Sequence, residues 1–156
     1  MIRMALEYDL STDADLRDDE LRAFFAAALE GEIGAGGAVF RDGMYATVYR
    51  VADGEEDETS RLFGFDERVS GTFRFQNAST EQDRQHNMAL MISSALAFSA
   101  RYASRGVLLH NGDVAVLQWS PGEVVFHSGW HDWLDSAEVA PLVAGHPVRP
   151  LPQPLL

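Results

Sequence analysis

Two apolar runs of the chain, residues 107–110 and 114–119, are separated by Asn111-Gly112, and this arrangement sharply limits the folds open to the sequence. Asn-Gly between apolar runs is the strongest short-range signal for a β-hairpin, because both residues tolerate the positive φ angles of a two-residue turn. A second turn at Ser120-Pro121-Gly122 leads into another apolar run at 124–127. The second half of the chain is therefore expected to contain three consecutive strands.

The first half of the chain contains further strand patterns. Residues 69–75 alternate apolar and polar positions and form the cleanest half-buried strand pattern in the sequence. Residues 5–10 predict a short first strand. Residues 38–40 and 45–51 predict two more strands, joined by the turn Arg41-Asp42-Gly43.

Two segments predict helices. The first helix is expected after side-chain oxygens that can cap it, at Ser11, Thr12, Asp13 and Asp15, and it has acids at 18–20 near its start. Its apolar stripe is Leu21, Phe24, Phe25, Ala28 and Leu29. The second opens at Ser79 and Gln82, which fit a capping box, and its apolar stripe is Met88, Met91, Ile92, Ala95, Phe98 and Tyr102. The order β-α-β-β-β-α-β-β-β predicts an α+β domain with an antiparallel sheet and the two helices on one face. We expect this single domain to cover residues 1–146, followed by a Pro-rich tail at 147–156.

The charge of the chain bears on its partners. Asp and Glu total 24 against 12 basic residues, all of them Arg, so the formal net charge is −12. Such a field repels nucleic acid and anionic membranes and steers a basic partner toward the chain, although acidity also maintains solubility. The absence of Cys fits a reducing compartment, and acids near the start argue against a secretion signal. We therefore expect a cytoplasmic protein without a membrane span, starting at Met1 or Met4.

The common catalytic patterns do not assemble in this sequence. The Gly-rich stretch 34–37 follows a predicted helix and precedes a predicted strand, whereas a phosphate-binding loop needs the reverse order. The chain has no Lys for a phosphate loop or a Schiff base, no Cys thiolate and no Gly-x-Ser-x-Gly motif. The sequence therefore predicts a protein that is not an enzyme and needs no cofactor.

A metal site is the alternative interpretation. His110 and His127 are on predicted strands that could be neighbours, and His131 with Asp132 follows shortly after. These four residues could make the chain a small His-ligated metal-dependent hydrolase. The residues between His127 and His131 are not expected to be helical, so their spacing does not place them on one face. Scattered His residues more often make local hydrogen bonds, and we predict no bound metal.

Two segments are candidates for binding a partner. Trp130 and Trp133 flank His131, and aromatic residues with polar groups concentrate at interfaces, although they could equally cover the end of the core. The second segment is a charged loop with five carboxylates in six residues: Asp53, Glu55, Glu56, Asp57 and Glu58. Such a loop is usually solvated, yet it would suit contact with a basic cleft. Self-association through a strand edge is a further alternative.

Three stretches carry a family resemblance: residues 4–10, Phe63-Gly64-Phe65-Asp66 before the strand at 69–75, and 110–114 followed by Trp130. In these the chain resembles the Sit-type immunity family of myxobacterial and actinobacterial polymorphic-toxin systems, from about Met4 to Trp133. The resemblance implies a cytoplasmic protein that binds a cognate toxin domain and protects the producing cell, without catalytic residues. Together with the charge, it predicts an immunity-type protein that neutralises its toxin by occluding a basic cleft.

Overall fold

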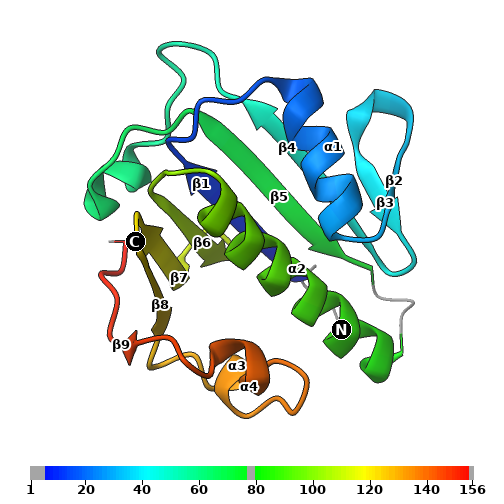
Figure 1. Cartoon of the computed structure of the whole chain (residues 1–156), viewed down its shortest axis with the longest axis vertical. Coiled ribbons are helices and arrows are strands. Elements are labelled where there is room, and N and C mark those ends of the chain that lie inside the picture. Colours follow the sequence, from blue (N-terminus) through cyan, green and yellow to red (C-terminus); the bar gives the residue numbers. More distant parts are fainter. Residues whose placement is uncertain (1–5, 77–79, 155–156) are drawn as a thin grey trace, which may run out of the picture.

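The computed structural model describes residues 6–76 and 80–154, and within them nine strands form one sheet (Figure 1). The spatial order is β2-β3-β4-β5-β1-β6-β7-β8-β9, and each neighbouring pair is antiparallel except β8 with β9. The strands are β1 (Leu6–Thr12), β2 (Glu32–Ile33), β3 (Val39–Arg41), β4 (Met44–Arg50), β5 (Val69–Phe75), β6 (Gly106–His110), β7 (Val114–Ser120), β8 (Glu123–His127) and β9 (Val148–Arg149).

Two long helices, α1 (Asp18–Ala28) and α2 (Glu81–Arg101), cover one face of this sheet, with α2 running diagonally across its middle (Figure 1). Leu21 and Phe25 of α1 are buried, as are Met91 and Phe98 of α2, because the apolar residues of each helix recur on one side. The single-turn helices α3 (His131–Leu134) and α4 (Ala140–Val143) follow β8, and the 3₁₀ segments are η1 (Ala35–Gly37) and η2 (Glu58–Phe63).

This architecture confirms the predicted α+β fold with a mostly antiparallel sheet and two main helices on one face. The structure adds short elements that the sequence pattern did not indicate: β2, β9, η1, η2 and α3. A two-residue strand or a single helical turn contains too few residues to show periodicity, so its conformation depends on tertiary contacts. The segment around Trp133, where the sequence showed no helical pattern, forms the single turn of α3 through such contacts.

The capping prediction for α1 was wrong. Ser11 and Thr12 belong to β1, and α1 begins after Arg17. The Thr12 hydroxyl donates to the Arg105 carbonyl over 2.7 Å, and the Asp13 carboxylate accepts from the Arg105 amide over 2.7 Å. These polar groups therefore hold the connection between α2 and β6. For α2, the Thr80 hydroxyl caps the helix by accepting from Asp83 N, while Ser79 lies outside the described residues.

The sheet has apolar clusters on both faces. The larger one lies under the helices and includes Tyr8 and Leu10 of β1. The smaller one lies on the opposite face, called the outer face below, where Phe63 and Phe65 near η2 pack with Val107 and other residues of β6, β7 and β8. The η2 segment therefore covers the β6–β8 half of the outer face, while the β4–β5 half stays open.

The predicted hairpin at Asn111-Gly112 is confirmed, since β6 pairs with β7 and both turn residues have positive φ, 47° and 77°. At the other end of β6, a Cβ atom on Gly106 would overlap the ring of Trp119. Glycine is required there by close packing. These two features hold β7 against β6, which pairs with β1 on its other side.

The segment after α4 lies along the edge of the sheet. β9 pairs with β8, Leu151 is 7% exposed, and the Gln153 side chain pairs with both backbone groups of Ala115 over 2.8 and 3.1 Å. A domain boundary at residues 146 and 147 stays a prediction.

Candidate functional site

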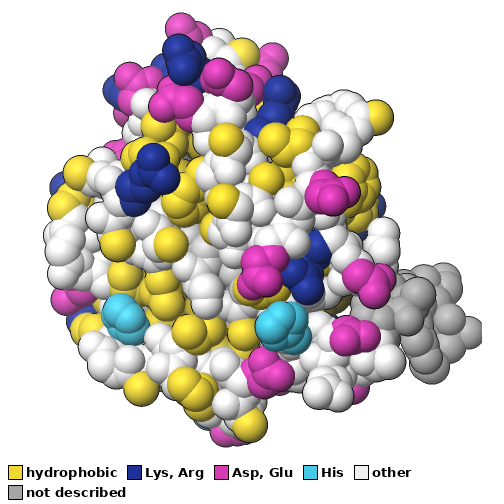
Figure 2. Space-filling model, turned by 45° about the vertical axis from the view of Figure 1, so that its right-hand side comes forward, with side chains coloured by type: hydrophobic (Ala, Val, Ile, Leu, Met, Phe, Trp, Pro, Cys, Tyr) yellow, Lys and Arg dark blue, Asp and Glu magenta, His cyan; other side chains and the backbone are white. Residues whose placement is uncertain are grey.

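The charged loop expected at residues 53–58, the acidic loop below, connects β4 to η2 and is exposed along its whole length. Within the described residues, none of its five carboxylates lies within 4.0 Å of an arginine nitrogen, because the nearby arginines pair elsewhere. Arg50 pairs with Asp15, and Arg61 pairs with Asp66 over 3.4 Å. Carboxylates and arginines gather at this end of the molecule, at the top in Figure 2.

One buried carboxylate fastens the acidic loop to the sheet. Glu67 is only 6% exposed, and it accepts from the Ser11 hydroxyl over 2.6 Å and from the Asp57 amide over 3.1 Å. Burial raises the pKa of Glu67, against the effect of these two hydrogen bonds, and the charges of Asp57 and Glu56 raise it further. Glu67 therefore holds the loop against β1 and carries no cationic partner among the described residues.

A second carboxylate without a cationic partner among the described residues lies on the outer face of β1, and it is half-buried. Asp9 accepts from the Thr72 hydroxyl over 3.1 Å, and no arginine or histidine nitrogen of the described chain lies within 4.0 Å of it. Burial raises the pKa of Asp9, and the charges of Glu7 and Asp57 add to that rise. Carboxylates that are partly desolvated and repelled by like charges are frequent at functional sites.

We call Glu7, Asp9, Asp57 and Glu67 the carboxylate row. Glu7, Asp9 and Ser11 alternate along β1 with Tyr8 and Leu10, so their side chains share the outer face. The Ser11 hydroxyl donates to Glu67, and Glu67 also accepts from the Asp57 amide, so hydrogen bonds connect β1 with the acidic loop. The row therefore joins the acidic loop to the open half of the sheet.

The open half of the outer face also carries aromatic residues. Tyr45 is paired through β5 with the position of Glu7, and Tyr49 with that of Ser11, so both belong to the same face as the carboxylate row. Tyr49 is 50% exposed and Phe40 is 44% exposed. The centroids of the Phe40 and Tyr45 rings lie 5.8 Å apart. Arg74 donates to the Tyr45 hydroxyl over 3.3 Å. An exposed strip of Tyr, Phe and Arg is typical of protein-binding surfaces.

The two tryptophans proposed as contact residues differ in position. Trp133 is 2% exposed and packs against Tyr8 and Phe126, with ring centroids 5.6 and 6.2 Å apart, so in this structure it is part of the core. Trp130 is half-buried, 4.6 Å from the His110 ring, while His131 is exposed. These residues lie at the opposite end of the molecule from the acidic loop (Figure 1).

The indole N–H groups of Trp130 and Trp133 are buried, and neither has an acceptor at hydrogen-bond distance and angle within the described residues. Burial raises the pKa of the Tyr8 hydroxyl to about 12. Both indole N–H groups lie beside this hydroxyl and lower its pKa, so they offset part of the effect of burial. Three hydroxyl or indole donors therefore share one small apolar space. Tyr8 stays un-ionised at any physiological pH.

The His residues do not form a metal centre in the part of the chain that the structure describes, where no group of three or more His, Cys, Asp or Glu could hold an ion. His127 accepts from the Leu151 amide over 3.1 Å, which fastens the segment after β9. His110 packs against aromatic rings, and burial lowers its pKa, although Asp113 and Asp132 oppose this. The alternative of a His-ligated hydrolase gains no support.

Sequence reasoning identified the acidic loop but missed Glu7, Asp9 and Glu67. The alternation along β1 was the available signal, since it places Glu7 and Asp9 opposite the buried Tyr8 and Leu10. The role of Glu67 was not readable, because its partner Ser11 is 56 residues away in the sequence.

Comparisons with known proteins bear on the whole chain. No helix among the described residues is long and apolar enough to cross a membrane. Neither a curated protein nor a solved structure matches the chain significantly. The model of one family, described as SitI3-like, matches residues 6–137, and this confirms the resemblance to Sit-type immunity proteins. The chain therefore belongs to the SitI3-like family.

Proposed function

We propose that this chain is a non-catalytic immunity protein, which binds a cognate toxin domain in the cytoplasm of the producing cell and neutralises it by occlusion. Membership of the SitI3-like family indicates an immunity protein. The observation that carries the proposed mode of binding is the carboxylate row, in which Asp9, Asp57 and Glu67 form no ion pair within the described chain. Glu7 lies opposite Arg74 on β5, and the pKa of that arginine is raised by the Tyr45 hydroxyl and further by the charge of Glu7.

The carboxylate row suits a basic surface for an energetic reason. Asp9 and Glu67 are already partly removed from water, and this burial raises the pKa of each. A Lys or Arg side chain of the partner would therefore gain attraction at Asp9 with less further loss of hydration than at a fully exposed carboxylate. The toxin surface complementary to this row is a basic cleft.

The acidic loop and the aromatic strip would have separate roles in this complex. The exposed charges of the loop act over a long range and raise the rate of encounter with a basic partner. Phe40, Tyr45 and Tyr49 provide rigid apolar area next to the carboxylate row, and such residues determine how slowly a complex dissociates. Trp130 and His131 lie away from this surface, and we propose them as a separate, peripheral contact, with Trp133 supporting Trp130 from the core.

The experiment is a binding measurement against the toxin domain encoded beside this chain, as a function of salt. Four carboxylates of the acidic loop are replaced by their amides: Glu55→Gln, Glu56→Gln, Asp57→Asn and Glu58→Gln. Asparagine at 57 keeps an oxygen to accept from the Thr59 amide, so the start of η2 is preserved. We expect association to slow by about tenfold at low salt, with a weaker salt dependence and little change in dissociation.

The matched control removes the same charge from exposed positions elsewhere. Its replacements are Glu81→Gln, Asp83→Asn, Asp135→Asn and Glu138→Gln, all at exposed residues outside the acidic loop. Equal slowing in both variants would show that only the net charge matters. No binding of the wild-type chain to the toxin domain at low salt would contradict the proposed function itself.

A further inference from the structure

Arg101 differs from the other arginines of the described chain. Each of the others donates a hydrogen bond or forms an ion pair, for example Arg41 to Asn87, Arg74 to Tyr45 and Arg105 to the Gly64 carbonyl. Arg101 does neither, and its recorded contacts are with two rings, Phe24 at 5.9 Å and Tyr102 at 5.2 Å from the centroid. All the N–H groups of its guanidinium are therefore available to a ligand.

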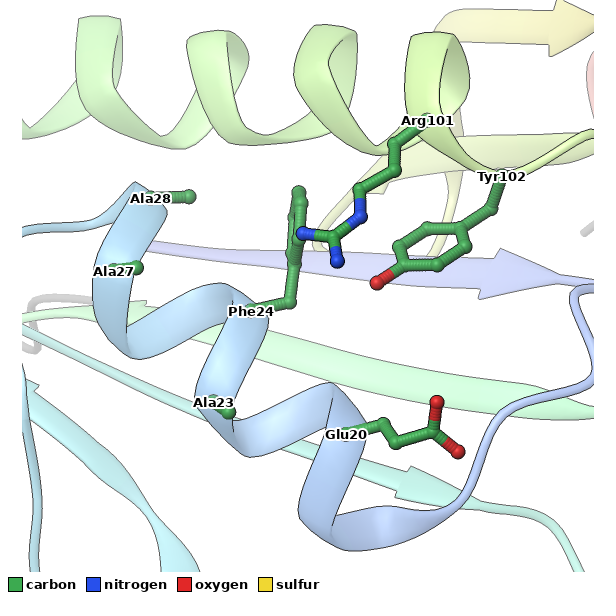
Figure 3. Close-up of a pocket in the computed structure, with 7 residues that line it drawn as sticks. All are labelled: Glu20, Ala23, Phe24, Ala27, Ala28, Arg101 and Tyr102. Carbon is green, nitrogen blue, oxygen red and sulfur yellow. The ribbon is translucent and has the colours of Figure 1, made fainter.

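The guanidinium lies in a groove between α1 and the end of α2 (Figure 3). The groove has a volume of about 540 Å³, and its lining residues are Glu20, Ala23, Phe24, Ala27, Ala28, Arg101 and Tyr102. Figure 3 shows the Arg101 head group between the rings of Phe24 and Tyr102, with the alanines along α1 and Glu20 near the start of that helix. Volumes of about 300–1,000 Å³ are usual for small-molecule sites.

The rings hold the guanidinium in place before any ligand arrives. Phe24 is itself fixed by edge-on contacts with Phe25, Phe98 and Tyr102 at 5.1, 5.4 and 5.7 Å. Cation–π contact with two rings restricts the orientations of the Arg101 head group and so lowers the entropy lost on binding. A planar, pre-oriented guanidinium with free donors matches a carboxylate, which it can bind through two parallel hydrogen bonds.

We propose that this groove binds a small amphipathic carboxylate, with its acid group on Arg101 and its aromatic or aliphatic body along Phe24 and the alanines of α1. The apolar lining selects the body, and Arg101 selects the charge. Glu20 at the rim disfavours a second negative group, which restricts the ligand to one carboxylate. The groove is on the helix side of the sheet, away from the carboxylate row, so this ligand would bind independently of the toxin.

The test uses 4-phenylbutyrate as the probe and its neutral amide, 4-phenylbutyramide, as the matched comparison. Backbone amide chemical shifts of the full chain are followed by NMR during titration with each compound. We expect the carboxylate to shift the amides of residues 20–28 and 98–102 and to bind about tenfold more tightly than the amide. Because the chain has a net charge of −12, added salt should strengthen this binding slightly by screening long-range repulsion.

Variants separate the groove from general effects. Arg101→Gln should lower the affinity for 4-phenylbutyrate to that of the amide, whereas Arg84→Gln on the same helix should leave it unchanged, since Arg84 is paired with Glu81. Ala27→Leu fills the groove at an exposed helical position and should weaken both compounds.

Three results would overturn the assignment. These are equal affinities for the carboxylate and the amide, shifts centred outside the groove, and unchanged binding in Arg101→Gln. A short peptide with Phe followed by Glu, if it bound more than about tenfold better than 4-phenylbutyrate, would assign the groove to a protein segment instead.

Discussion

Replacement of Glu67 by alanine should loosen the acidic loop and destabilise the fold. The carboxylate accepts from Ser11, which is 7% exposed, and from the amide of the exposed Asp57. A buried donor left without a partner costs about 1–3 kcal/mol, whereas water replaces the lost partner of an exposed one. Removal of a desolvated charge offsets part of this loss. We therefore expect Glu67→Ala to lower the free energy of unfolding by about 1–2 kcal/mol.

Glu67→Gln separates the charge from the hydrogen bonds. Its amide oxygen can accept from Asp57, and its NH₂ group can donate to the Ser11 hydroxyl, so the anchoring geometry is kept. The pKa of Glu67 is raised in the folded chain, so its contribution to stability is complete below its unfolded pKa of about 4.5 and is lost as the pH rises through the folded pKa. Glu67→Gln has no such dependence, and it should equal or exceed the wild type at neutral pH.

Urea unfolding of the wild type and both variants, from neutral pH to pH values near 4.5, measures these effects. The difference between wild type and Glu67→Gln should move in favour of the wild type as the pH falls. Hydrogen exchange at the Asp57 amide should quicken in Glu67→Ala only. A constant difference across this pH range, or unchanged Asp57 exchange in Glu67→Ala, would refute the anchoring role of Glu67.

Three further outcomes follow from the packing. Gly106→Ala should destabilise the chain by about 1–3 kcal/mol, because its methyl group would overlap Trp119; thermal unfolding measures this, and an unchanged Tm would contradict the packing described. Trp133→Ala should lower the free energy of unfolding by about 3–5 kcal/mol. Trp133→Phe should lower it much less, because this change also removes an N–H group without a hydrogen-bond partner. Equal losses for the two variants in urea unfolding would oppose this. Asp9→Asn should stabilise the chain at neutral pH but lose that advantage as the pH falls, since the pKa of Asp9 is raised in the folded state; a pH-independent gain would be inconsistent with this.

The elements that sequence reasoning identified are those with a repeated pattern. The alternation in residues 69–75 and the apolar stripe of α2 each repeat several times, and both are found as expected. The Asn111-Gly112 turn needed no repeat, because its backbone chemistry is local. The α+β class followed from the order of these elements.

The parts that were missed depend on contacts between distant residues. Thr12 and Asp13 suggested a helix cap from their sequence neighbours, yet they bond to Arg105, which is 93 and 92 residues away in the sequence and directly precedes the neighbouring strand β6. The carboxylate row likewise forms only when β1, β5 and the segment before β5 come together. Sequence composition showed that the chain is acidic, while the fold decides which of its acids lie together on the open outer face.

The affinity of the toxin domain for two single-charge variants tests the central claim most directly. Thr47→Arg places a cation on the open outer face, at the position paired with Thr72, whose partner on the other side is Asp9. Gln82→Arg adds the same charge at an exposed site on α2. With thermal unfolding confirming that both fold, we expect Thr47→Arg to weaken binding by at least about 30-fold and Gln82→Arg by less than about threefold. Equal effects of the two substitutions would contradict binding through the carboxylate row.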